Sequence, residues 1–174
     1  MSDSERLRFK ILEVLEILRL PEHPSRTFFT DEARKLLEWK NMHGISGLWE
    51  EPPLMLTATL DDGWGHGLDV IRLYAEAAGV RVLHAGLLRT PEFIIEECRR
   101  YEPDILGMTV LQFDTEEALA LIRQKIPLKT RIVAGGPLFR ADAEFAQRCG
   151  IDVTAKDAAE FMAYLLGWHK FSSI

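Results

Sequence analysis

Residues 54–67 read Leu-Met-Leu-Thr-Ala-Thr-Leu-Asp-Asp-Gly-Trp-Gly-His-Gly. A short apolar run followed at once by a glycine-rich stretch is typical of a buried strand, a loop and a helix start. The pattern predicts a strand over Leu54–Leu60, a loop over Asp61–Gly67 and a helix over Gly67–Ala78 that ends at Gly79. Three glycines in this loop permit positive backbone angles and close approach of a ligand, and the helix start offers free N–H groups.

The same alternation of apolar runs and amphipathic stretches continues to residue 166. Four further strands are predicted, over Val80–His84, Ile105–Leu111, Arg131–Ala134 and Ile151–Thr154. Four further helices alternate with them, over Pro91–Tyr101, Thr115–Lys125, Ala141–Cys149 and Ala158–Leu166. Such strands pair in parallel through right-handed crossovers. The predicted fold class is therefore α/β, a flavodoxin-like doubly wound five-stranded parallel sheet in the order 2-1-3-4-5.

The first 50 residues differ from the rest and predict a short N-terminal helical extension. Apolar residues at helical spacing indicate one helix that ends at Pro21: Leu7, Ile11, Val14, Leu15 and Leu18. Thr30 is the expected N-cap of a second helix, which ends at Gly44. We expect an extension over residues 1–50 and a main domain over residues 54–167. Leu12 and other apolar residues widen the first helix's surface beyond one stripe, which predicts a homodimer through these helices.

Composition narrows the functional classes. The 174 residues are 28% charged with a formal net charge of −6, which argues against general nucleic-acid binding. No apolar run reaches the ~18 residues of a membrane span, and the N-terminus lacks the apolar region of a signal peptide. Cys98 and Cys149 form no CxxC motif, so neither a disulfide framework nor a zinc site is indicated. We expect a cytoplasmic protein without nucleic-acid or membrane partners.

In doubly wound sheets, ligands bind beyond the carboxyl ends of the strands. The loops at that edge are expected at Asp61–Gly67, Gly86–Thr90, Thr109–Thr115, Gly135–Phe139 and Thr154–Asp157. Within them, a paired glycine after the fourth strand would allow something bulky to approach, and a Thr109 hydroxyl could donate to a ligand. The alternative for the glycine pair is a tight turn, and the alternative for Thr109 is an ordinary strand residue.

Asp61, Asp62 and Lys156 resemble the acidic and basic positions of response-regulator receivers. Receivers also require a phosphoacceptor aspartate at the end of the third strand, because an aspartyl phosphate is their chemistry. Here that strand has Asp104 at its beginning and Thr109 towards its end. The receiver interpretation is therefore rejected.

Five short elements in order carry a different resemblance. They are Asp62-Gly63-Trp64-Gly65-His66-Gly67, Arg89-Thr90-Pro91-Glu92, Asp104-Ile-Leu-Gly107 leading to Thr109-Val110-Leu111, Gly135-Gly136, and Gly150-Ile-Asp152 with Ala155-Lys-Asp157-Ala158. Over Leu54–Leu166 the sequence resembles the cobalamin-binding domains of methionine synthase, methylmalonyl-CoA mutase and corrinoid methyl carriers. In that family the nucleotide tail of cobalamin enters a channel between the sheet and its helices, and a loop histidine ligates cobalt.

The resemblance implies a set of cofactor-binding residues in this chain: Asp62, Gly63, Trp64, Gly65, His66, Gly67, Thr109, Leu111, Gly135, Gly136 and Ala155. Trp64 stands where the family has its histidine ligand, and an indole has no lone pair to offer cobalt. One alternative is base-off cobalamin without a protein histidine, with Trp64 packed under the macrocycle. Another is ligation by His66.

The third alternative is loss of cobalamin, with the fold retained as a protein-interaction module or as a sensor of haem or another ligand. Haem would need an axial ligand such as His66 or His84. No pair of histidines has metal-ligand spacing, which argues against a dedicated metal site, and no metal ligand is assigned.

The family resemblance implies a corrinoid carrier or a corrinoid-dependent sensor. No nucleophile with a base and no pair of carboxylates with defined geometry is evident, so no catalytic residue is assigned. Catalysis in this family lies in partner domains. We therefore expect a module that is accessory to a methyltransferase, a mutase-type partner or a regulatory protein.

Overall fold

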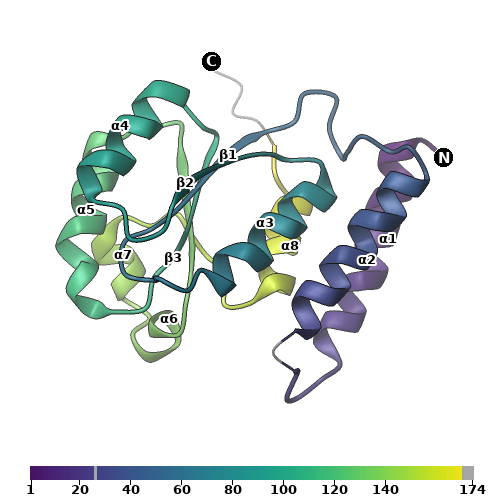
Figure 1. Cartoon of the computed structure of the whole chain (residues 1–174), viewed down its shortest axis with the longest axis horizontal. Coiled ribbons are helices and arrows are strands. Elements are labelled where there is room, and N and C mark those ends of the chain that lie inside the picture. Colours follow the sequence, from purple (N-terminus) through teal and green to yellow (C-terminus); the bar gives the residue numbers. More distant parts are fainter. Residues whose placement is uncertain (26, 170–174) are drawn as a thin grey trace. The chain divides into compact units, whose positions relative to one another are not determined.

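The computed structural model describes residues 1–25 and 27–169, and its five strands form one parallel sheet (Figure 1). The strand order is β2-β1-β3-β4-β5, which confirms the predicted flavodoxin-like topology. The strands are β1 (Leu54–Thr59), β2 (Arg81–Gly86), β3 (Ile105–Thr109), β4 (Arg131–Gly135) and β5 (Val153–Thr154). The helices are α1 (Asp3–Arg19), α2 (Phe28–Met42), α3 (His66–Ala78), α4 (Pro91–Tyr101), α5 (Glu116–Lys125), α6 (Leu138–Ala141), α7 (Phe145–Cys149) and α8 (Ala158–Leu166), with a 3₁₀ turn η1 (Phe113–Thr115) before α5.

The chain forms two compact units, and each draws on separate parts of the sequence. The first unit consists of Met1–Pro52, Asp69–Arg81 and Asp157–His169. The second consists, among the described residues, of Pro53–Leu68 and Val82–Lys156, and it holds the sheet. The predicted division into residues 1–50 and 54–167 stays a prediction.

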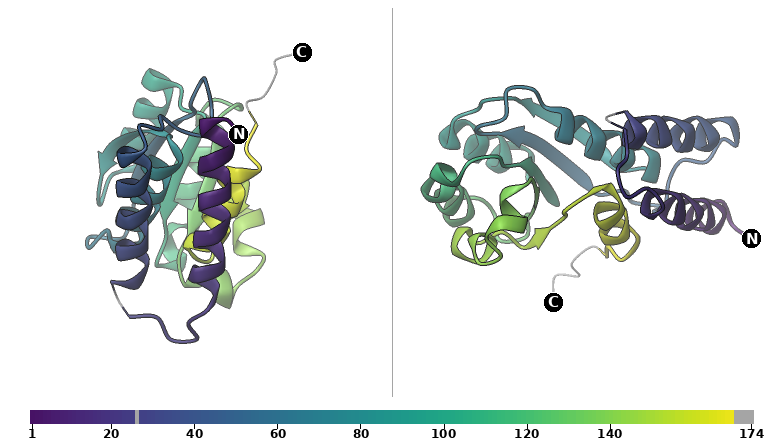
Figure 2. Two further views of the ribbon diagram at one scale, coloured as in Figure 1. Left: turned by 90° about the vertical axis from the view of Figure 1, so that its right-hand side faces the viewer. Right: turned by 90° about the horizontal axis from the view of Figure 1, so that it is seen from below.

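The first unit is helical. Helix α1 begins with a capping box, in which Ser2 and Glu5 satisfy each other's backbone N–H groups. It packs against α2 and α8, which lie beside it (Figure 2). The buried stripe of α1 is the one that the spacing predicts: Leu7, Ile11, Val14, Leu15 and Leu18. The Tyr74 hydroxyl donates to the Phe29 carbonyl oxygen at 2.9 Å, which ties α3 to α2.

The second unit builds its core on one face of the sheet. Leu56, Leu106 and Ile132 point to this face from three neighbouring strands. Helices α4, α5 and α7 supply the opposing apolar side chains: Ile94, Ile95, Cys98, Leu119, Ile122, Phe145 and Cys149. These contacts form the apolar core on that face, and the opposite face also buries the strand residues Met55, Ile105 and Val133.

Some predicted boundaries are wrong. The helix expected over 141–149 is two short helices, α6 and α7, because Asp142 adopts an extended backbone and its carboxylate accepts the Glu144 N–H. Thr30 is not an N-cap, since α2 begins at Phe28 and the Thr30 hydroxyl donates to the Thr27 carbonyl oxygen. Strand β3 ends at Thr109 rather than at residue 111.

Both cysteines are free and buried. Burial raises the pKa of the Cys98 thiol to about 12 and that of the Cys149 thiol to about 11. Neither thiol is therefore a thiolate at neutral pH. Within residues 1–25 and 27–169, no helix combines the length and the apolar character that crossing a bilayer requires.

Candidate functional site

The carboxyl ends of three central strands lie in one row at the edge of the sheet. Thr59 pairs with Thr109, and Thr109 pairs with Gly135. Two residues earlier, on the same face, Thr57 pairs with Gly107. Because side chains alternate along a strand, these positions share the face opposite to the apolar core. That face ends in short side chains, where a buried parallel sheet usually carries Val, Ile or Leu.

The loop after β1 is held by one carboxylate. Asp62 is only 5% exposed. Its Oδ1 accepts the backbone N–H groups of Trp64 and Gly65 at 2.8 and 2.9 Å. Its Oδ2 accepts the Thr109 hydroxyl at 3.2 Å, from the end of β3. The loop and the strand end are therefore fixed to each other without a ligand.

The neighbouring carboxylate holds the next loop. Asp61 Oδ2 accepts the backbone N–H groups of Leu111 and Gln112 at 2.9 and 2.7 Å. This contact draws residues 111–112 towards Asp61. The sequence predicts no role for Asp61. Only its position after a strand could have indicated one, because its partners are backbone groups fifty residues away.

The glycines of the site allow its backbone segments to approach each other closely. A Cβ on Gly67 would lie 2.9 Å from Thr109 Cγ2, and one on Gly135 would lie 2.7 Å from the Ala155 carbonyl oxygen. Gly136 has a φ of +138°, and a Cβ there would collide with the Val110 carbonyl oxygen. A substitution at Gly135 or Gly136 would disturb the backbone as well as any ligand.

Trp64 is 81% exposed at the tip of the loop. His66 is the first residue of α3 and is exposed. His84 lies in β2, where its Nδ1 is 2.9 Å from the Thr57 hydroxyl. Within the described part of the chain, no three His, Cys, Asp or Glu residues gather as metal ligands.

Three loops at this edge carry exposed large apolar side chains. They are Trp64 after β1, Leu88 after β2, and Leu111 and Phe113 after β3. Exposed apolar groups on neighbouring loops indicate a binding surface for a largely apolar partner. The sequence predicts Trp64 and Leu111 as site residues but not Leu88 or Phe113, whose exposure cannot be read from the sequence.

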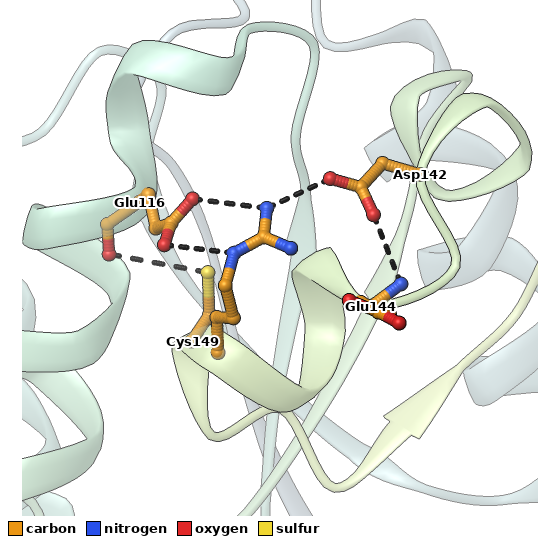
Figure 3. Close-up of polar contacts among 5 residues, drawn as sticks. Glu116, Asp142, Glu144 and Cys149 are labelled. Atoms are coloured by element: carbon orange, nitrogen blue, oxygen red, sulfur yellow. Dashed lines mark hydrogen bonds and ion pairs between the residues drawn. The ribbon is translucent and has the colours of Figure 1, made fainter.

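An ion-pair cluster connects the segments that follow β3 and β4 (Figure 3). Arg148 of α7 contacts both carboxylate oxygens of Glu116 at 3.0 and 3.1 Å, and Asp142 Oδ2 at 2.7 Å. The hydrogen bond from Arg148 holds the pKa of Asp142 below its ordinary value. Since Glu116 starts α5 and Asp142 follows α6, the cluster fixes the first turn of α5 to the segment after Gly135-Gly136.

The predicted site residues thus lie on loops and strand ends at one edge of the second unit. Asp62, Thr109 and the loop glycines are brought into contact. Ala155 follows β5, and its N–H donates to the Ala134 carbonyl oxygen at 2.9 Å. Their role in binding stays a prediction.

Comparison with known proteins gives a family match. The model of the B12 binding domain matches residues 55–164. No curated protein is similar enough in sequence to count as a relative.

Several solved structures share the fold. A novel cobalamin-binding protein from Desulfitobacterium hafniense DCB-2 has a TM-score of 0.66 at 17% identity, over 81% of this chain and 69% of its own. The monomethylamine corrinoid protein of Methanosarcina barkeri has a TM-score of 0.61 at 19% identity, over 77% and 62%. The methanol:cobalamin methyltransferase complex MtaBC of Methanosarcina barkeri has a TM-score of 0.58 at 16% identity, over 80% and 56%. This chain thus spans less than two thirds of the two Methanosarcina chains.

The Asp62 contacts predict a measurable loss of stability. Asp62→Ala leaves the N–H groups of Trp64 and Gly65 without their acceptor, so the free energy of unfolding should fall by about 2–4 kcal/mol. Asp62→Asn keeps one acceptor oxygen and should cost less. Asp69→Ala removes an exposed carboxylate paired with Arg72 and should cost less than about 1 kcal/mol. Urea unfolding checks this, and equal losses for Asp62→Ala and Asp69→Ala would contradict it.

Proposed function

This chain belongs to the B12-binding domain family, and we propose that it is a corrinoid carrier that presents its cofactor to a partner protein. Family membership supports the corrinoid. A corrinoid-dependent sensor would use the same site and is the variant of the proposal in which the partner is a regulatory protein. When bound, a corrinoid supplies a cobalt ion that carries an alkyl group or changes its oxidation state.

The observation that carries the proposal is a row of short side chains at the end of one sheet face. Thr59, Thr109 and Gly135 form this row, and Thr57, Gly107 and Val133 precede it. The last row has no large side chain, and three of the side chains on this face carry hydroxyls, which suit a narrow polar chain such as the nucleotide tail. The residues present therefore fit the tail of a corrinoid, and we propose that this face holds it.

We further propose that no protein nitrogen ligates cobalt from below. The Trp64 side chain is exposed and has no lone pair for a metal. The exposed apolar side chains of Trp64, Leu111 and Phe113 supply a surface for a flat, largely apolar ring. The tail, held by the sheet, is proposed to leave the cobalt in a base-off state.

Catalysis is assigned to a partner, a methyltransferase or a mutase-type enzyme. Neither cysteine offers a nucleophile, because burial keeps both thiols protonated. Their free state also supports a cytoplasmic location, since reducing compartments preserve thiols.

Titration of the full chain with corrinoids tests the proposed function. Hydroxocobalamin should bind in a saturable way, follow the protein through desalting, and change its visible spectrum. Cobinamide, which lacks the nucleotide tail, should bind at least about tenfold more weakly, a difference of about 1.4 kcal/mol. Haemin serves as the comparison ligand. Binding of haemin without binding of either corrinoid would contradict the proposal.

Electron paramagnetic resonance tests the missing lower ligand. Protein loaded with cobinamide and reduced to cobalt(II) contains no nitrogen base from the cofactor, so a triplet splitting reports a protein nitrogen. The wild type should show none, and Trp64→His, which restores an imidazole at the ligand position, should introduce it. His66→Ala should leave the wild-type spectrum unchanged. A triplet in the wild type that disappears in His66→Ala would assign the ligand to His66.

A homodimer through α1 is part of the proposal. Helix α1 exposes four large apolar residues outside its buried stripe: Phe9, Leu12, Ile17 and Leu20. Such a face favours burial against a second copy. Leu18 belongs to the buried stripe of the first unit and would be a poor probe of the exposed face.

Leu12→Glu with Leu20→Glu should convert the dimer into a 19.9 kDa monomer, because two charges would enter the contact. Light scattering and sedimentation at micromolar concentration measure the mass. Leu128→Glu, at a 93% exposed leucine of the second unit, is the matched control and should stay dimeric. A monomeric wild type would contradict the dimer.

A further inference from the structure

Leu88 has an unusual backbone conformation. Among residues 1–25 and 27–169, only Leu88 and Glu102 have a positive φ without being glycine, at +51° and +45°. Glu102 is the C-cap of α4, a position that often takes this conformation. Leu88 caps no helix, and a branched apolar residue is disfavoured in the left-handed region. Strained residues of this kind gather at binding sites.

The Leu88 side chain is 61% exposed. Its neighbour Leu87 differs, because its side chain lies against Gly65, where an added Cβ would be 2.9 Å away. Packing therefore explains Leu87. Leu88 has both a strained backbone and an exposed apolar side chain. Its side chain adds no contact to the apolar core that would offset this cost.

Thr59 couples Leu88 to the first loop. The Thr59 hydroxyl accepts the Leu88 N–H at 2.9 Å and donates to the Asp62 carbonyl oxygen at 2.6 Å. The Thr59 carbonyl oxygen accepts the Arg89 N–H at 2.8 Å. Leu88 Cδ1 lies 3.3 Å from where a Cβ of Gly63 would be, so the side chain lies beside the residue that precedes Trp64.

From these contacts we infer that Leu88 is a ligand-contact residue, which together with Trp64 forms the apolar surface for the flat corrinoid ring. This inference rests on the proposed function. Thr59 fixes the Leu88 backbone, and Gly63 leaves space for its side chain. The contact involves the ring and not the nucleotide tail, so it acts equally on corrinoids with and without a tail.

The test compares substitutions at the two strained positions. Asparagine tolerates the left-handed region, so Leu88→Asn and Glu102→Asn should both retain or raise the urea midpoint of unfolding. Leu88→Asn should weaken the binding of cobinamide and of hydroxocobalamin by the same factor, about tenfold, because the apolar contact is lost. Glu102→Asn should bind both ligands like the wild type. Leu88→Met, which restores an apolar side chain, should recover most of the affinity.

The outcomes of this test distinguish the Leu88 contact from the proposed function. A wild type that binds corrinoid together with a folded Leu88→Asn that binds equally well would overturn the Leu88 contact and leave the proposed function standing. A loss confined to hydroxocobalamin would assign Leu88 to the tail and overturn the ring contact. A wild type that binds neither corrinoid would refute the proposed function and the Leu88 contact with it.

Discussion

The buried carboxylate of Asp62 is the contact on which the carboxyl edge of the sheet depends. It takes two backbone N–H groups from its own loop and a hydroxyl from the end of β3. A buried carboxylate has to be compensated by donors, and these three donors supply that compensation locally. Because the partners come from two segments forty-seven residues apart, satisfying the charge also sets the position of the first loop above the sheet.

The two faces of the sheet carry different side chains at the carboxyl edge. One face carries Leu56, Leu106 and Ile132 and forms the apolar core with α4, α5 and α7. The other ends in threonines and glycines, which bury little apolar area. Further from that edge the same face carries Met55, Ile105 and Val133, which are buried. The alternation of side chains thus gives both faces apolar residues and leaves short side chains only towards the carboxyl edge of this face.

The sequence predicts those features that depend on local patterns. Apolar runs, glycines at helix ends and the chirality of crossovers are sufficient for the strand order and for most helices. The break between α6 and α7 was missed because it depends on the extended backbone at Asp142. Asp61 and Leu88 were missed for a related reason. The partners of Asp61 are backbone groups of residues 111 and 112, and the φ of Leu88 is set by contacts with Thr59.

The same hydrogen bonds make the fold of the first loop independent of the side chain at position 64. Asp62 accepts the backbone N–H of residue 64 and that of Gly65, and neither bond involves the side chain at position 64. The indole is exposed, so it contributes little to the packing of the chain. The conformation of the loop is therefore independent of the side chain that it displays. A domain built in this way can change the chemical group that it displays at position 64 and keep its scaffold.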